Sequence, residues 1–155
     1  MMNKNVRYLW AGILLVSLVS TGQAVETKVP LKDLPPSVRK TVEDLGKGAT
    51  LRQVVSEVDK GKTVYEAQLI ANGHTRDVSI NAEGTVMETE EETTLANVPS
   101  TVRSALEKSA GAGKIVKVEV VTRADHSAIY EGVVAKGTEK SEIRVDSLGN
   151  LLPAE

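Results

Sequence analysis

The chain has 155 residues, and its 19 Lys and Arg residues against 21 Asp and Glu residues give a formal net charge of −2 at pH 7. These charges are spread along the sequence without a basic cluster, which argues against nucleic acid or an anionic membrane as a partner. Cysteine is absent, which excludes disulfides, cysteine nucleophiles and thiolate metal sites. Aromatic residues make up only 3% of the chain, so Val, Leu and Ile must fill the core.

The N-terminus has the three zones of a secretory signal peptide. Lys4 and Arg7 precede an apolar run at 9–19, and the small residues Gly22 and Ala24 stand where a signal peptidase cuts. We therefore predict cleavage after Ala24 and a periplasmic or extracellular protein. The alternative is a retained membrane anchor, but about 11 apolar residues fall short of the about 20 that span a bilayer.

Two segments have the pattern of a short amphipathic helix. "LPPSVRKTVEDL" (34–45) and "VPSTVRSALEKS" (98–109) both contain proline at their start, where a missing N–H group is tolerated. Both place apolar residues three or four positions apart, which predicts one buried stripe on each helix. Leu106 belongs to the stripe of the second helix. Glycines that follow each segment predict where the helices end.

Strand-like runs follow each predicted helix. In the second half Val116, Val118 and Val120 alternate with Lys117 and Glu119, as expected where one face of a sheet is solvated. The stretch "YEAQLIANGHTRDVSINAEGTV" from Tyr65 is then echoed by "YEGVVAKGTEKSEIRVDSLGNL" from Tyr130. Each copy contains two further strand-like runs and a glycine turn into a short last strand.

This recurring order predicts an α+β fold of two tandem repeats, each with one helix packed on a four-stranded antiparallel meander sheet. One such unit alone would bury little apolar surface, so we expect the two units to share a face. The acidic segment at 87–97 is predicted to be a solvated joint. The predicted divisions are a signal peptide at 1–24, a flexible tail at 25–33, a first repeat at 34–92 and a second repeat at 93–155.

The order of motifs resembles a known family. A proline, a helix and a strand are followed by Tyr-Glu-Ala at 65–67 or Tyr-Glu-Gly at 130–132, and then by Val-x-Ile or Ile-x-Val and a glycine turn. This pattern, over about 34–152, resembles the PepSY-like, β-lactamase-inhibitor-like (BLIP-like) domains of secreted bacterial proteins. The resemblance implies a tandem of helix-plus-sheet units that binds or inhibits proteins such as secreted peptidases and other hydrolases. We transfer no inhibitory residue from it.

The sequence contains no pattern typical of a catalytic or cofactor site. The two histidines, His74 and His126, stand beside turn-like stretches at non-equivalent positions, and we interpret them as solvated rather than catalytic. No glycine-rich loop precedes a helix in the way that a phosphate site requires. We therefore predict a protein that is not an enzyme, with no catalytic residue and no cofactor.

A metal site is also not predicted. The acidic run from Glu88 to Glu92 lacks the alternate ligand spacing and the turn glycine of a calcium loop. Two histidines without cysteine give no zinc pattern. A solvated segment is the preferred interpretation of the acidic run.

Two surfaces could bind a partner. Tyr65 and Tyr130 are expected to pack under the helices, with a ligand-facing position as the alternative. The candidate partner-binding residues project from the opposite face of the sheet, although charged strand faces are usually just solvated. These residues are Gln53, Glu66, Gln68, Lys117, Glu119 and Glu131. An unpaired edge strand, to which an extended peptide could add, is a second option.

The sequence thus favours an exported, non-enzymatic module that binds another exported protein or an extended peptide and could inhibit a secreted peptidase or other hydrolase. The alternative is a sensor or accessory module of the cell envelope that binds a small ligand or a metal ion. A hydrolase ranks third.

Overall fold

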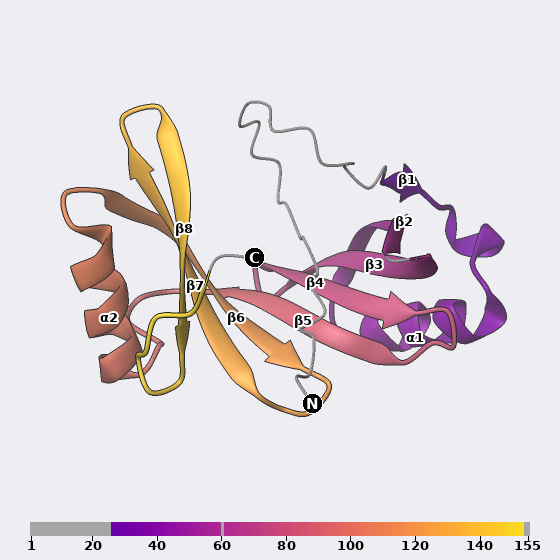
Figure 1. Cartoon of the computed structure of the whole chain (residues 1–155). Coiled ribbons are helices and arrows are strands. Elements are labelled where there is room, and N and C mark those ends of the chain that lie inside the picture. Colours follow the sequence, from indigo (N-terminus) through magenta and orange to yellow (C-terminus); the bar gives the residue numbers. More distant parts are fainter. Residues whose placement is uncertain (1–25, 60, 154–155) are drawn as a thin grey trace.

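The computed structural model describes residues 26–59 and 61–153 (Figure 1). The predicted signal peptide and its cleavage site lie outside these residues. Within the described ranges, neither helix is sufficiently long and apolar to cross a membrane. The elements in chain order are β1 (Thr27–Lys28), the 3-10 helix η1 (Leu31–Asp33), α1 (Pro36–Leu45), β2 (Thr50–Asp59), β3 (Lys62–Ala71), β4 (His74–Asn81), β5 (Val86–Thr93), α2 (Ser100–Ala110), β6 (Lys114–Arg123), β7 (Ala128–Lys136) and β8 (Glu139–Asp146).

The strands form one antiparallel sheet in which β1 to β8 follow their order in the chain. The predicted fold class of two repeats, each with a helix on its own four-stranded meander, is therefore wrong. β5 joins the two predicted sheets into one, because Glu90 pairs with Asp77 of β4 on one side and with Val121 of β6 on the other. The predicted solvated joint is thus largely a central strand of a continuous sheet.

Local chemistry explains why so acidic a segment forms a strand. β5 has threonine at both ends of the stretch 89–93, which reads Thr-Glu-Glu-Glu-Thr, and β-branched threonines favour extended backbone. Its glutamates also find cations on both neighbouring strands. Glu91 pairs with Arg76 of β4 at 2.8 Å, and Glu88 pairs with Arg123 of β6 at 3.2 Å. The segment has no apolar period, which is why the sequence pattern predicted a joint.

The two ends of the sheet also differ from the expectation. Residues 27–33 were expected to belong to a flexible tail, but Thr27 and Lys28 pair with β2, and η1 follows them. Leu34 is buried at 4% exposure. At the other end the predicted last strand is reduced to a single bridge between Val145 and Leu151.

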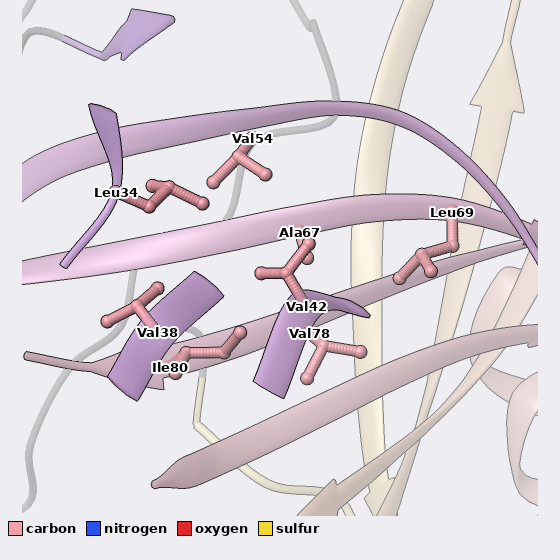
Figure 2. Close-up of a cluster of buried hydrophobic side chains, with 8 residues drawn as sticks. All are labelled: Leu34, Val38, Val42, Val54, Ala67, Leu69, Val78 and Ile80. Atoms are coloured by element: carbon pink, nitrogen blue, oxygen red, sulfur yellow. The ribbon is translucent and has the colours of Figure 1, made fainter. Parts of the chain in front are cut away.

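The helices occupy the positions that the sequence predicts, and both cover the same face of the sheet. Val38 and Val42 of α1 pack on one core cluster (Figure 2), which also contains Leu34, Val54, Ala67, Leu69, Val78 and Ile80. The second cluster contains Val98, Val102, Leu106, Val118 and Val145. A row of directly paired residues, Leu69, Arg76, Glu91, Val120 and Tyr130, joins the two clusters across one face. Tyr65 and Tyr130 pack against these clusters, which confirms the expected position of both rings.

Glycine turns hold the helices against the sheet. Gly84 has a φ of +85°, and a Cβ atom at this position would lie 2.8 Å from the carbonyl carbon and oxygen of Ser37. Thr41 Oγ1 donates a hydrogen bond to the carbonyl oxygen of Gly84 at 2.7 Å. Gly149, with a φ of +87°, approaches the carbonyl oxygen of Thr101 in the same way. Only glycine permits this contact between turn and helix.

Leu106→Ala tests the packing of α2. The side chain has 0% exposure in the second cluster, and truncation of a buried leucine costs about 2 to 5 kcal/mol. Urea unfolding followed by circular dichroism should show a loss of this size. A loss near zero would mean that the helix face is assigned wrongly.

Gly84→Ala tests the contact between the turn and α1. The matched control is Gly73→Ala, because Gly73 has the same φ of +85° but no atom within 4 Å of an added Cβ. Backbone strain alone should destabilise the control by about 1 kcal/mol, and Gly84→Ala should lose clearly more. Equal losses in the two variants would show that close approach to Ser37 does not matter.

Candidate functional site

The face of the sheet opposite the helices carries many charged side chains. Paired residues of neighbouring strands point to the same face, and successive residues of one strand point to opposite faces. One row of this face runs through Gln53, Gln68, Asp77, Glu90 and Val121. We call this side the helix-free face, and the charged residues of its central part are Glu57, Glu66, Asp77, Glu88, Glu90, Glu92, Lys117, Glu119, Arg123, Glu131 and Arg144.

The structure places all six sequence-predicted site residues on the helix-free face, in two groups. The first group, on β2 and β3, is a chain of hydrogen bonds. Gln53 Nε2 donates to Gln68 Oε1 at 2.8 Å, and Gln68 Nε2 donates to Glu66 Oε1 at 2.6 Å. The two amides therefore orient the carboxyl group of Glu66, a residue that is 5% exposed.

The second group lies on β6 and β7. Lys117 Nζ lies 2.6 Å from Glu119 Oε1, and Glu119 is directly paired with Glu131. Burial favours a lower pKa of Lys117, but the hydrogen bond and the charge of Glu119 outweigh it and raise that pKa. Arg144 of β8, which the sequence did not single out, donates through Nε to Glu131 Oε1 at 2.7 Å.

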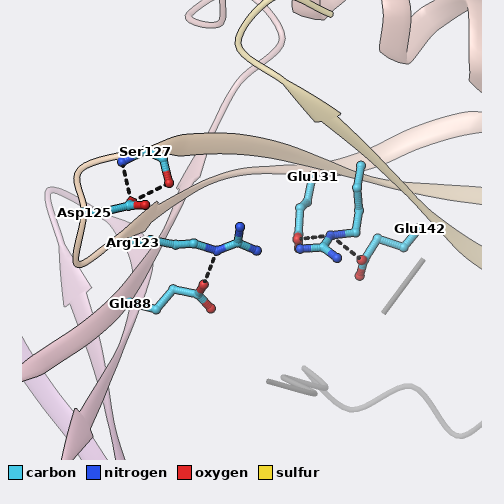
Figure 3. A network of polar contacts seen from close by, with 7 residues as sticks. Glu88, Arg123, Asp125, Ser127, Glu131 and Glu142 are labelled. Atoms are coloured by element: carbon cyan, nitrogen blue, oxygen red, sulfur yellow. Dashed lines mark hydrogen bonds and ion pairs between the residues drawn. The ribbon is translucent and has the colours of Figure 1, made fainter. Parts of the chain in front are cut away.

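Ion pairs also cross between strands at the centre and at the β8 side of this face (Figure 3). Arg123 Nε lies 3.2 Å from Glu88 Oε2. The guanidinium of Arg144 reaches Glu142 as well as Glu131, at 4.0 Å for Glu142. The face is therefore an ordered network rather than a set of independent solvated side chains.

The two groups are separated by residues of β4 and β5 that sequence reasoning missed. Asp77 of β4 is directly paired with Glu90 of β5. Among residues 26–59 and 61–153, neither carboxylate makes a hydrogen bond or an ion pair through its oxygens. Like charges placed directly opposite each other destabilise a sheet. The period of two in Glu88, Glu90 and Glu92 is a local signal at Glu90, but it fits a solvated segment equally well, and no local pattern marks Asp77.

Burial changes the protonation of these carboxyls. Burial raises the pKa of Glu66 to about 8 and that of Glu90 to about 9, and neighbouring carboxylates add to both shifts. Burial also raises the pKa of Glu131 to about 7 and that of Asp77 to about 6. Glu66 and Glu90 are therefore mainly neutral at pH 7, which relieves part of the repulsion.

The fold gives no support to a histidine site or a metal site in the described residues. His74 is exposed at the start of β4, and His126 is exposed in the turn between β6 and β7. No three His, Asp or Glu side chains of the described ranges are arranged to hold one metal ion. The helix-free face is the candidate functional site, and the arrangement there can bind groups that donate hydrogen bonds or carry positive charge.

Comparisons with known proteins support the fold. No protein-family profile and no curated protein sequence matches the chain. A DUF2874 family protein from Bacteroides ovatus has a similar structure, with a TM-score of 0.63 and 23% identity over 77% of this chain and 85% of that chain. A proposed periplasmic protein from Bacteroides eggerthii gives a TM-score of 0.66 and 22% identity over 77% of this chain and 86% of that chain.

A BLIP-like protein from Bacteroides fragilis is also similar, with a TM-score of 0.59 and 24% identity over 77% of this chain and 84% of that chain. The BLIP-like part of the sequence resemblance is thereby supported at the level of the fold. The PepSY-like part and the tandem repeat are not shown by these neighbours.

The raised pKa values predict a dependence of stability on pH. The carboxyls of Glu66 and Glu90 ionise near their ordinary pKa in the unfolded chain but only at about 8 and about 9 in the folded protein. At pH values between the ordinary pKa and the raised pKa, the folded state binds more protons than the unfolded chain. The free energy of unfolding therefore falls as pH rises. Urea titrations between about pH 5 and about pH 9 should show this fall.

Glu90→Gln should make that pH dependence shallower, because the amide cannot ionise. The matched control is Glu107→Gln, at an exposed position of α2, which should keep the slope of the parent protein. A Glu90→Gln protein with an unchanged slope would contradict the assignment of a buried, neutral Glu90.

Proposed function

We propose that the chain is an exported, non-enzymatic binding module, and that its helix-free face binds another exported protein or an extended peptide. Export is supported by the signal-like N-terminus, and a periplasmic location is consistent with the proposed periplasmic neighbour from Bacteroides eggerthii. His74 is exposed at the start of β4, and His126 is exposed in a turn. These positions support a role other than hydrolysis, because a catalytic histidine needs a nucleophile and an orienting group beside it.

The observation that carries the proposal is the direct pairing of Asp77 with Glu90 at the centre of the sheet. Glu119 extends the same acidic region, since it is paired with both Glu92 and Glu131. Two opposed carboxyls in a partly buried position cost stability, either through repulsion between their charges or through the protonation that relieves this repulsion. A sheet that served only as a scaffold would be more stable with uncharged residues at these positions, so a binding role accounts for their presence.

Inhibition is the finer part of the proposal. Binding to a secreted peptidase or other hydrolase through this face would inhibit that enzyme if the module covered its active site. The BLIP-like neighbour supports this possibility through its name and its fold alone.

Affinity capture with matched charge variants tests the face. The purified exported chain serves as bait in envelope extracts of the source cells, beside the double variant Glu90→Gln/Glu119→Gln and the control Glu43→Gln/Glu107→Gln. Both variants remove two carboxylates, but Glu43 and Glu107 are exposed on the helices. A partner held by the parent and the control should be retained at least about tenfold less by the double variant, which corresponds to about 1.4 kcal/mol.

Circular dichroism should show that the three proteins are equally folded. Equal retention of the same partner by all three baits would refute the helix-free face as the binding surface.

A further inference from the structure

The two ends of the sheet are closed in different ways. At one end Thr27 and Lys28 of β1 pair with the middle of β2. At the other end β8 is the last strand among the described residues (Figure 1), and the chain returns to it where Val145 bridges Leu151. Over 139–143 the sheet therefore ends at β8, and the edge of a sheet is a template for a further strand.

The backbone of β8 points a defined set of groups toward this edge. The carbonyl oxygen of Arg144 accepts a hydrogen bond from Leu152 N at 2.9 Å, on the side of β8 away from β7. In an antiparallel ladder the N–H and C=O groups of every second residue point to the same edge. The backbone groups of Lys140 and Glu142 therefore point outward as well.

The side chains of these two residues carry opposite charges. Lys140 and Glu142 are both exposed, and they lie on the helix-free face because they stand at alternate positions before Arg144, which pairs with Glu131. A strand that is protected against pairing with its own copy carries charges of one sign, since like charges then meet in every register. Because its charges have opposite signs, β8 is complementary to a second β8 that runs antiparallel to it.

One register of such a pair satisfies both the charges and the backbone. With Ser141 opposite its own copy, Lys140 meets Glu142 of the second copy, and the outward backbone groups of these two residues face each other. Moving the axis by one residue, to Glu142 or to Lys140, brings like charges together. Moving it one residue beyond Glu142 would pair Lys140 with Asp146, whose N–H already donates to the carbonyl oxygen of Asn150 at 3.0 Å.

We propose that the chain forms a twofold homodimer, in which β8 pairs antiparallel with β8 of a second copy over 139–143 and Ser141 lies on the axis. Such an interface uses the same surface of both copies. The axis is perpendicular to the sheet, so both helix-free faces point the same way and form one continuous surface. Glu142 lies 4.0 Å from Arg144, which also pairs with Glu131, so the ion-pair network of one copy continues into the other.

Sedimentation equilibrium of the purified exported chain tests the dimer without any binding partner, and hence independently of the proposed function. The overlap is short, so we expect a monomer–dimer equilibrium with a Kd between about 1 μM and about 1 mM. Raising the salt concentration from about 0.05 M to about 0.5 M should weaken the dimer, because the ion pairs beside the axis are exposed to solvent. A chain that stays monomeric at about 1 mM would refute the dimer.

Charge reversal tests the register. Lys140→Glu and Glu142→Lys each place like charges opposite each other, so each variant should dimerise at least about tenfold more weakly than the parent chain. A mixture of the two variants should dimerise again, because each substituted position then faces a position of opposite charge. The control Glu43→Lys, at an exposed position of α1, should leave dimerisation unchanged.

Cross-linking tests the position of the axis, since the chain contains no cysteine. Ser141→Cys should form a disulfide-linked dimer on mild oxidation, because opposed residues of a pair without hydrogen bonds have Cα atoms about 4.5 Å apart. Glu139→Cys is the matched control. Glu139 is also exposed and points to the same face, but it faces Ile143 of the second copy and should cross-link clearly more slowly.

Circular dichroism should show that all variants are folded like the parent chain, because the changed side chains are exposed. Equal dimerisation of the parent and both β8 charge variants, or equal cross-linking from positions 139 and 141, would overturn the pairing of β8 in this register. A monomeric parent whose capture of an envelope protein depends on Lys140 would assign the edge of β8 to a strand of another protein. That result would also overturn the homodimer.

Discussion

The pairing of β5 with strands on both sides is the constraint on which the rest of the structure depends. Asp77 of β4 and Val121 of β6 flank Glu90, so the backbone of β5 is satisfied by hydrogen bonds in both directions. A buried backbone group without a partner would cost free energy comparable to a lost hydrogen bond. This ladder makes the two helix-covered parts one sheet and keeps an acidic segment at its centre.

One continuous sheet gives the protein two faces of opposite character. The helices cover one face through clusters built from aliphatic side chains, and the strong twist of the sheet turns its two ends relative to each other (Figure 1). On the other face, within the part that the structure describes, no helix covers the charged residues. Val121 and Ile129 are buried beside those charges, so the carboxyls sit in a partly apolar environment that raises their pKa values.

The candidate site could be predicted in part from the sequence. The alternation in Lys117 and Glu119, and the tyrosine strands with Glu66 and Glu131, placed six residues on the correct face because the period of two is a local property of a strand. Asp77 and Glu90 could not be found in this way. Their importance comes from direct pairing between strands, and the acidic period of β5 also fits a solvated segment.

The sequence by itself determined the two helices, most of the strands and the face to which each side chain points, because capping prolines, glycine turns and alternation act within a few residues. The tertiary structure alone decided that β5 joins two halves into one sheet, and that residues 27–33 pair and pack instead of forming a tail. Strand pairing is a contact between residues far apart in the chain, and no local pattern specifies which edges meet. The opposed carboxyls of the helix-free face are a consequence of that pairing.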